Sequence, residues 1–218
     1  MVKVGFLRSS MPVMLMVIYI GSCFAVDIQE NYHVAKASYT QNRPPYTDHA
    51  ARARYMVHRS DWAIINTIST KPGIEGYPFG NKWSISDGAS DNSTGIPYVY
   101  VTKFDVTAKD FSVDNNVTMT FVEAEFQDIG ECQISKVSDP ESPLCATLLL
   151  IGSITNITDA TELEFAEKAI FTRHPFMRDW PASHGFHCMK MMIKKLWLTD
   201  YFGGGVFVSV DDYFNAKP

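Results

Sequence analysis

Alternating apolar and polar positions recur along most of the chain after residue 60. This alternation, rich in β-branched and aromatic residues and interrupted by turn-forming clusters, predicts strands over 62–70, 82–86, 96–102, 117–122, 147–153, 189–201 and 206–210. Two segments instead carry apolar residues at helical spacing: 49–59, which Asp48 can cap, and a helix that begins after Asp159 or Thr161 and ends at Arg173. The strands follow one another through turns rather than alternating with helices. The pattern therefore predicts a mainly β fold, an antiparallel barrel or sheet with peripheral helices.

The composition indicates one folded domain. The chain has 218 residues, of which 46% are hydrophobic and 20% are charged, as in ordinary globular proteins. Its net charge is −5, and no dense run of Lys and Arg follows the first residues. Binding to nucleic acid requires a basic surface that meets the phosphate backbone, so we expect no nucleic acid partner.

The N-terminal residues form a pattern of their own. Lys3 and Arg8 precede an apolar run over 11–20, and small residues surround a cleavage position after Ala25. This arrangement of a positive region, a short apolar region and small residues is typical of a secretory signal peptide. We therefore expect residues 1–25 to be a signal peptide.

Two other interpretations of this segment are open. An uncleaved membrane anchor is disfavoured because the apolar run is short for a span and no second long run follows, so we expect no membrane span after signal removal. Ile20-Gly21-Ser22-Cys23 also resembles a bacterial lipobox, which would keep Cys23 as a lipid anchor. Beyond the signal, we expect a flexible segment over 26–45 and one folded domain over 46–218.

Three Asn-x-Ser/Thr sequons follow the predicted signal peptide: Asn92-Ser93-Thr94, Asn116-Val117-Thr118 and Asn156-Ile157-Thr158. Behind a signal peptide, such sequons predict N-glycosylation of their Asn residues. The first lies in a polar loop and the third in a turn before a helix, so both should be accessible, whereas the second borders a strand. The sequons favour a eukaryotic secretory route, and hence a secreted glycoprotein, over the lipobox interpretation.

The predicted mature chain contains three cysteines. Cys132 and Cys145 flank a Pro-containing loop, and a disulfide between them would close it and stabilise the fold by about 2–4 kcal/mol. The alternative is two reduced, buried thiols, but an oxidising compartment favours the bridge. The odd count leaves Cys188 as a free thiol.

Other motifs give no support for a catalytic or metal centre. His174, His184 and His187 lie near Cys188 in the sequence, but their spacing matches no compact metal-binding pattern, which favours hydrogen-bonded structural histidines over metal ligands. The glycines over 203–205 predict a tight turn between the last two strands, because the Lys-Ser/Thr of a phosphate-binding loop is missing. No Gly-x-Ser-x-Gly elbow is present either. We therefore assign no catalytic, cofactor-binding or metal-ligating residue.

Several sequence strings together resemble the CREG family of secreted glycoproteins, the cellular repressors of adenovirus-stimulated genes. They cover about 46–214, and the most specific is Arg173-His174-Pro175-Phe176-Met177, followed by Trp180-Pro181. The others are Ser60-Asp61-Trp62, Thr67-Ile68-Ser69-Thr70, Pro78-Phe79, Ser86-Asp87-Gly88, Gly95-Ile96-Pro97-Tyr98, Asp139-Pro140-Glu141-Ser142-Pro143-Leu144-Cys145, Ser183-His184 and Asp200-Tyr201-Phe202-Gly203-Gly204.

The resemblance implies a split β-barrel like that of the pyridoxamine-phosphate oxidases, assembled as a homodimer, in which flavin binding has been lost. It also implies a secreted or lysosomal protein that affects growth and differentiation and is recognised through its glycans by a cell-surface or endosomal receptor. The sequon at Asn156 falls where the family carries one. By this resemblance the protein is not an enzyme and has no cofactor.

One segment bears on the flavin question. Residues 102–111 match a stretch that supplies basic phosphate contacts in flavin oxidases, and here they offer Lys103 and Lys109 but no Arg. No Arg lies between Arg59 and Arg173, so bidentate phosphate clamps are missing from the centre of the chain. We expect the arginines nearest to this region, Arg52, Arg54 and Arg59, to form a solvated helix face.

The sequence thus supports two hypotheses of different class. The favoured one is a non-catalytic glycoprotein that binds a receptor. The alternative is a flavin- or haem-dependent oxidoreductase on the same barrel, because a fold does not by itself determine a function.

Overall fold

The computed structural model describes residues 43–89, 91–202 and 204–218. The predicted signal peptide, nearly all of the predicted flexible segment and Gly203 lie outside these residues. Residues Arg43–Pro218 form one compact unit. Its helices are α2 (His49–Arg59), α3 (Val106–Val113), α4 (Ala160–Arg173) and α5 (Val210–Asn215), with short 3₁₀ turns at Glu123–Glu125, Gly130–Cys132, Pro175–Asp179 and Ala182–His184. Its strands are β1 (Trp62–Ile68), β2 (Pro78–Ser86), β3 (Tyr98–Val101), β4 (Val117–Val122), β5 (Thr147–Asn156), β6 (His187–Thr199) and β7 (Gly205–Val208).

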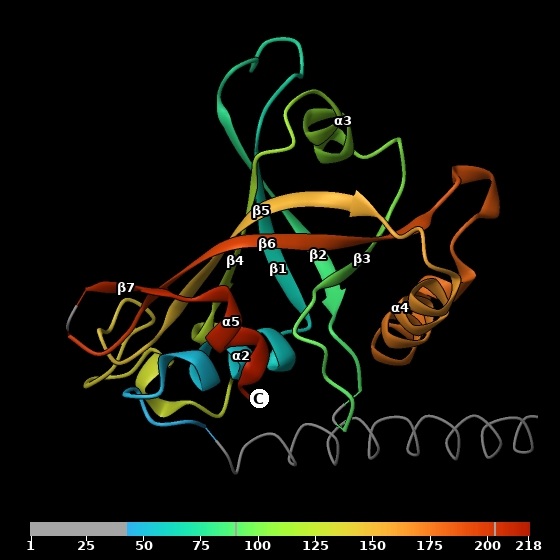
Figure 1. The fold of residues 1–218 in the computed structure, drawn as a ribbon. Helices are drawn as coiled ribbons and strands as arrows, with labels where there is room; N and C mark the ends of the chain where they lie inside the picture. The colour runs from blue at the N-terminus through green and yellow to red at the C-terminus, as the bar shows by residue number, and fades with distance from the viewer. Residues whose placement is uncertain (1–42, 90, 203) are drawn as a thin grey trace, which may run out of the picture. The chain divides into compact units, whose positions relative to one another are not determined.

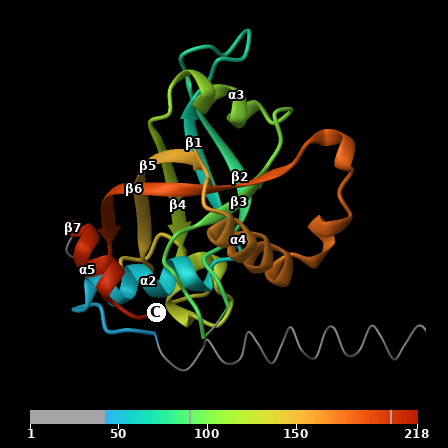
Figure 2. The ribbon, with the colours of Figure 1, turned by 45° about the vertical axis from the view of Figure 1, so that its right-hand side comes forward.

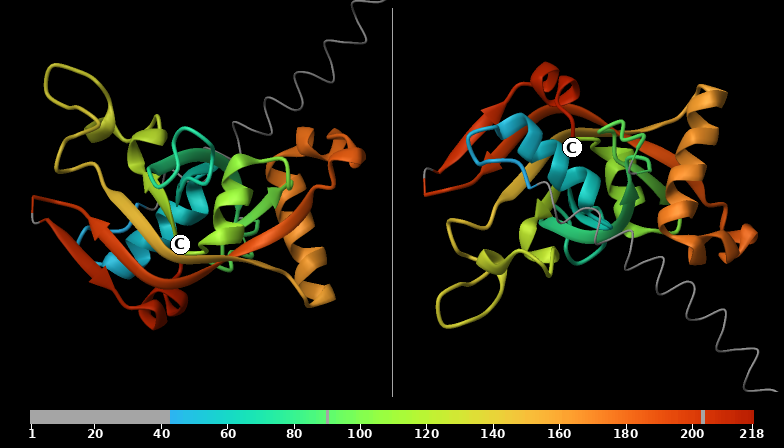
Figure 3. Two further views of the ribbon diagram at one scale, coloured as in Figure 1. Left: turned by 90° about the horizontal axis from the view of Figure 1, so that it is seen from above. Right: turned by 90° about the horizontal axis from the view of Figure 1, so that it is seen from below.

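The strands form a closed antiparallel barrel (Figure 1). Their order is β3-β2-β1-β4-β5-β6-β7, and a further pairing between β3 and β6 closes the first six into a ring. The long strand β6 makes this possible: it pairs with β3 near its start, with β5 along most of its length and with β7 at its end. Figure 3 shows the ring from its two ends. The prediction of an antiparallel barrel with peripheral helices is confirmed.

Helix α2 lies across one end of the barrel and α3 across the other (Figures 1 and 2). The side chain of Asp48 caps α2 by accepting a hydrogen bond from the backbone N–H of Ala51 at 3.1 Å, as the sequence predicted. Ala53, Met56 and Val57 are fully buried and join the core formed by the inward-facing residues of the strands. The alternation along each strand thus fills the barrel from its wall, and α2 fills it from one end.

The observed elements differ from the predicted ones in several places. Helix α3 was missed because its apolar residues are not concentrated on one face, and α5 was missed because the last strand was expected to run to Val210. Ser209 explains the second difference, since its side chain caps α5 by accepting from the N–H of Asp212 at 3.0 Å and so ends β7 at Val208. Strand β2 begins four residues earlier than predicted, at Pro78, where it completes the hairpin with β1.

Strands β5 and β6 bend through a β-bulge that lets the sheet close. The pairing shifts between Ile151 and Gly152, and a Cβ added at Gly152 would lie 1.9 Å from the carbonyl oxygen of Met192. A side chain therefore does not fit at this position. Bulges of this kind increase the local bend and twist of a sheet, which barrel closure requires.

A tight turn joins β6 to β7, as the glycine run predicted. The positive φ angles fall on two aromatic residues, Tyr201 at 48° and Phe202 at 49°, as well as on Gly204 at 74°. A left-handed conformation is unfavourable for bulky residues, so neighbouring contacts must hold it. Tyr201 stacks on Tyr46 with ring centroids 3.6 Å apart, and the N–H of Phe202 donates to the carbonyl of Pro143 at 3.3 Å.

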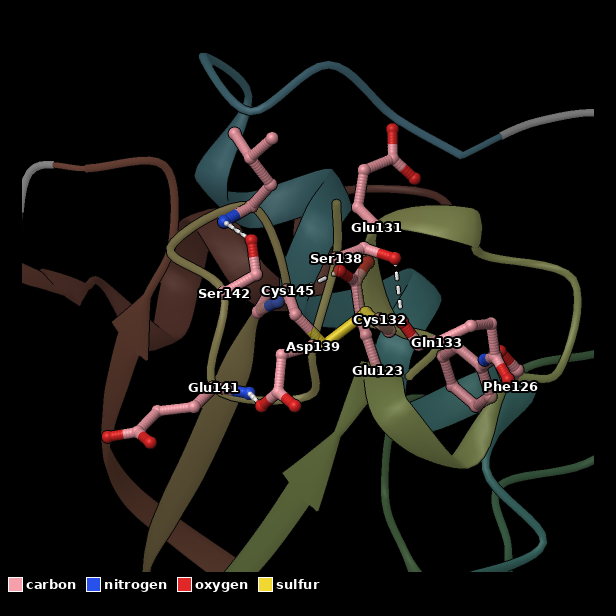
Figure 4. Close-up of a disulfide and its surroundings, with 12 residues drawn as sticks. Glu123, Phe126, Glu131, Cys132, Gln133, Ser138, Asp139, Glu141, Ser142 and Cys145 are labelled. Atoms are coloured by element: carbon pink, nitrogen blue, oxygen red, sulfur yellow. Dashed lines mark hydrogen bonds between the residues drawn. A yellow bond between two sulfur atoms is a disulfide. The ribbon is translucent and has the colours of Figure 1, made fainter. Parts of the chain in front are cut away.

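Cys132 and Cys145 are bonded to each other in the structure (Figure 4). The bridge closes a loop whose tip is exposed, with Val137 95% accessible. A turn inside the loop is held by Ser138, whose N–H donates to the Ser135 hydroxyl at 3.1 Å. The disulfide therefore fixes the base of an otherwise exposed segment against the barrel.

We predict that this loop can be cut without separating the chain. Trypsin should cleave after Lys136, which is exposed at the loop tip, because exposed tips are preferred sites of proteolytic nicking. The two fragments should migrate together without reductant and apart with it, as measured by gel electrophoresis.

The free energy of unfolding of the Cys132→Ser/Cys145→Ser double variant should be lower than that of the wild type by about 2–4 kcal/mol. Two free, alkylatable thiols at these positions in the native protein would contradict the bridge.

Glu125 is a half-buried carboxyl group at the base of the same loop. It accepts a hydrogen bond from the backbone N–H of Asp61 at 3.0 Å. Burial raises the pKa of Glu125 to about 7 from its ordinary 4.5, and the nearby charge of Asp61 contributes in the same direction. Between these two pH values the folded chain holds a proton that the unfolded chain releases. This group therefore stabilises the fold increasingly as pH falls from about 7 to 4.5.

Glu125→Gln should remove this dependence. The difference in unfolding free energy between wild type and variant should change by about 1–3 kcal/mol as pH falls from near-neutral to acidic, to the advantage of the wild type. Urea unfolding of both proteins across this range measures it. The comparison cancels His174, whose pKa is lowered by burial and which acts in the opposite direction in both proteins. A constant difference at all pH values would contradict the prediction.

Candidate functional site

All three predicted glycosylation residues lie on the surface. Asn92 is in the loop between β2 and β3, Asn116 immediately precedes β4, and Asn156 is the last residue of β5, and each is exposed. The latter two lie at the same end of the barrel, because Asn115 exchanges hydrogen bonds with the backbone of Ile154 at 2.8 and 2.9 Å. The loop that carries Asn92 contacts α2 at the other end.

That loop is organised around the fully buried carboxylate of Asp87. The Ser93 hydroxyl donates to Asp87 Oδ2 at 2.5 Å, and the N–H of Gly95 donates to the same oxygen at 3.2 Å. The imidazole Nδ1 of His58, from α2, lies 2.6 Å from the other carboxylate oxygen. Burial opposes ionisation, but the bond and charge of His58 outweigh it, and the pKa of Asp87 is lowered. The carboxylate is therefore the charged centre of this end of the molecule.

The residue types Ser, His and Asp meet here without forming a hydrolytic triad. Nucleophilic catalysis requires the hydroxyl to donate to the imidazole, with the carboxylate behind it. Here the Ser93 hydroxyl and the His58 ring both bind Asp87, which stands between them. The Ser93 hydroxyl thus does not donate to the imidazole, and Asp87 and His58 are both buried. The cluster therefore lacks the order of contacts of a Ser-His-Asp triad and instead holds the loop against α2.

The three arginines of α2 do not form the solvated helix face that was predicted from the sequence. Arg52, Arg54 and Arg59 are 3%, 4% and 8% exposed. Arg54 donates to the carbonyl and hydroxyl oxygens of Ser93 at 3.0 and 2.9 Å, and Arg59 pairs with Asp128. Their partners come from loops far away in the sequence, so helical periodicity could not reveal that this face is covered.

Arg52 belongs to a second buried group of charges. Its guanidinium lies 3.2 Å from Glu123 and 3.1 Å from Asp200, and Arg43 binds the same glutamate at 2.7 Å. Glu123 is fully buried and also accepts from the N–H of Ala146 at 2.9 Å. A surface hollow of about 380 Å³ borders this group. The charged groups around the hollow are paired within the chain, Arg43 with Glu123 and Glu131 and Arg52 with Glu123 and Asp200.

The segment over 102–111, which the resemblance relates to a phosphate-contacting stretch, does not fit a phosphate group. It runs from the turn after β3 into helix α3, where Lys103 and Lys109 are exposed and no Arg is present. Asp105 caps α3 by accepting from the N–H of Thr107 at 2.7 Å, and Asp110 is fully buried. With two acids built into the fold and two solvated ammonium groups, the segment offers no convergent donors for a dianion.

The histidines singled out in the sequence have structural contacts. The Nε2 of His174 lies 2.9 Å from the carbonyl oxygen of Ile85, and the His184 ring packs against Phe104 and Phe186. Cys188 is a free, buried thiol, and burial raises its pKa to about 12, so it is protonated and unreactive at physiological pH. Among the residues that the structure describes, no group of three His, Cys, Asp or Glu is placed to hold a metal ion.

Comparison with solved structures supports the fold. A haem-binding protein from Mycobacterium smegmatis superposes with a TM-score of 0.58 at 17% identity, covering 80% of this chain and 62% of that one. ChuZ from Campylobacter jejuni gives a TM-score of 0.55 at 12% identity, covering 82% of this chain and 68% of that one. At such low identity the likeness concerns the barrel alone.

In the described part of this chain, no helix has the length and apolar character needed to cross a membrane.

Comparison with characterised sequences identifies the family. The chicken protein CREG1 is 38% identical over 177 residues, covering 80% of this chain and 90% of its own. Human CREG1 is 35% identical over 79% of this chain and 76% of its own. Mouse CREG2 is 39% identical over 78% of this chain, which spans only 57% of that longer relative. The family described as the CREG β-barrel matches residues 44–215, and this chain belongs to it.

Proposed function

We propose that this protein is a secreted, N-glycosylated and non-catalytic CREG protein that works as a homodimer. In this proposal it travels through the extracellular space or the endosomal and lysosomal compartments, where a glycan-recognising receptor binds it, and it affects growth and differentiation. The observation that carries the proposal is the exposure of all three sequon asparagines on a CREG barrel, behind a sequence typical of a signal peptide.

The positions of the three sequons support glycan recognition, because glycans there would leave the outer face of the sheet free for another partner. Asn116 and Asn156 lie at one end of the barrel and Asn92 at the other. Glycans on these residues would project from both ends and leave the outer face of β1, β4, β5 and β6 uncovered. A receptor that reads glycans and a partner that binds the sheet could therefore occupy the same molecule together.

The outer face of that sheet is the surface we propose for dimerisation. A row of opposed residues crosses five strands: Ile64, Thr120, Leu149, Trp197 and Phe207. Phe207 is exposed and the other four are half-buried. The rings of Phe207 and Trp197 pack against each other with their centroids 4.8 Å apart. Exposed contiguous apolar surfaces of this kind mark interaction sites.

The neighbouring row supports burial of this face. The side-chain amide of Asn66 donates to the hydroxyl oxygens of Thr118 and Thr120 at 3.0 and 3.1 Å. The donors of the Asn66 amide are therefore bonded within the chain. A second copy that covered this face would not leave them unpaired, which would otherwise cost free energy.

The second candidate function, a flavin- or haem-dependent oxidoreductase, is favoured by one observation only. A solved structure with the same barrel is named as a haem-binding protein. Against it, the three arginines of α2 are buried and bind groups of their own chain, and the segment over 102–111 contains no Arg that could bind a phosphate group. We therefore place the non-catalytic role first.

We predict that the mature protein begins at Val26 and carries N-glycans, with Asn92 and Asn156 among the modified residues. Purified secreted protein should lose mass on treatment with a peptide-N-glycosidase, and its N-terminal sequence should start at Val26. Mass spectrometry measures both. An unchanged mass would end the glycoprotein proposal.

We predict that the protein is a dimer at micromolar concentration and that Leu149→Glu makes it monomeric. The added carboxylate lies at the centre of the proposed face, where burial of an unpaired charge is costly. The matched control is Val113→Glu, which places the same charge on a residue that is 75% exposed in α3. Light scattering should show a monomer for the first variant only. A monomeric wild type, or a dimeric Leu149→Glu variant, would contradict the proposed interface.

We predict no tight binding of flavin mononucleotide. Titration of the purified protein, followed by quenching of flavin fluorescence, should give no saturation in the low micromolar range, because the segment over 102–111 contains no Arg to bind the phosphate. The purified protein should also lack visible flavin or haem absorbance. Stoichiometric binding would instead promote the oxidoreductase hypothesis.

A further inference from the structure

The sequon at Asn92 differs from the other two in what its hydroxyl groups do. The hydroxyl of Thr94 donates to the backbone carbonyl of Asp87 at 2.9 Å and accepts from the N–H of Ile96 at 3.1 Å. The Ser93 hydroxyl is held between Asp87 and Arg54 at 2.5 and 2.9 Å. Although Asn92 itself is exposed, both hydroxyls that follow it are therefore engaged in the folded protein.

The backbone of this sequon is fixed as well. The N–H of Asn92 donates to the carbonyl of Ala89 at 2.9 Å, and that of Thr94 donates to Asp87 at 2.8 Å. A Cβ added at Gly88 would lie 2.1 Å from the carbonyl oxygen of Asn92. Glycan transfer requires the acceptor sequence to be accessible to the enzyme and its Thr hydroxyl to be free for recognition. Closure of the 87–95 loop removes both conditions.

The sequon at Asn156 does not have this restriction. Its Thr158 is exposed and lies just before the cap of α4, outside β5. The strand that holds Asn156 in the sheet is β6, which pairs it with Met189, a residue synthesised later. This sequon therefore stays open during synthesis, until β6 has emerged.

The loop at Asn92 has most of its partners available early. Arg54 and His58, which bind Ser93 and Asp87, precede the loop in the chain, whereas Arg173 and Tyr213 come later. The chain grows at about 5–20 residues per second, while hairpins form in about 1–10 μs. Loop closure is thus fast enough to compete with glycan transfer while the chain is still being made.

We propose that folding of the 87–95 loop competes with glycan transfer to Asn92, so that the secreted protein is a mixture in which this residue is partly unmodified while Asn156 is filled. The inference rests on the proposed function, since it assumes that the chain passes the glycosylation machinery. It goes beyond that function by making the Asp87 cluster the determinant of glycan content at one end of the barrel.

Two variants outside the acceptor sequence test this. Asp87→Asn weakens the carboxylate interactions that close the loop, and Gly88→Ala obstructs closure sterically. Asp114→Asn is the matched control, because Asp114 is exposed and binds Asn116 rather than the Asn92 loop. The proteins are expressed in animal cells and collected from the total cell extract, so a variant that is not secreted is still measured. Glycopeptide mass spectrometry then gives the modified fraction at each site.

The expected result is an unmodified fraction at Asn92 in the wild type that falls about twofold or more in Asp87→Asn and Gly88→Ala, because slower closure lengthens the time available for transfer. The fraction at Asn156 should not change, and Asp114→Asn should leave Asn92 as in the wild type. Complete modification of Asn92 in the wild type, or an unmodified fraction that neither variant lowers, would overturn the inference. Absence of glycans at Asn156 as well would instead defeat the proposed glycoprotein function.

Discussion

A single buried carboxylate holds together the end of the barrel that α2 covers. Asp87 has no solvent contact, so its charge must be balanced inside the protein, and it gathers an imidazole, a hydroxyl and a backbone N–H from α2 and from its own loop. Arg173 at the end of α4 lies 3.9 Å away and ties that helix to the same centre. Removing one partner would leave a buried charge uncompensated, so Asp87 stabilises the positions of Ser93 and Gly95, which bind it.

The arginines of α2 are also paired with groups inside the protein. Guanidinium groups are the donors best suited to bind phosphate, yet those of the α2 region serve carboxylates and carbonyls of their own chain. The arrangement stabilises the packing of loops over α2. The arginines of α2 are therefore engaged by groups of their own chain and are not free to bind a phosphate group.

The sequence predicted the parts of this architecture that depend on local patterns. Strand alternation, the bounds of α2 and its cap at Asp48 follow from neighbouring residues and are present in the structure, and of the two predicted caps of α4 the structure has Asp159. It did not predict the burial of Arg52, Arg54 and Arg59, because their partners come from segments that are remote in the chain. Nor did any motif mark Asp87 as the organising residue of its loop. An isolated Asp-Gly reads as a turn, and only the tertiary arrangement shows how many donors converge on it.

The long strand β6 determines what happens to a chain that is truncated before it. Because the ring closes only when β6 pairs with both β3 and β5, a chain that stops before it does not form a smaller domain. It forms an open sheet in which β3 and β5 each present an unpaired edge, flanked by the apolar residues meant for the barrel interior. Such edges template association with other chains. Premature termination anywhere upstream of β6 should thus yield an aggregating product that cellular quality control removes, with no partially active fragment.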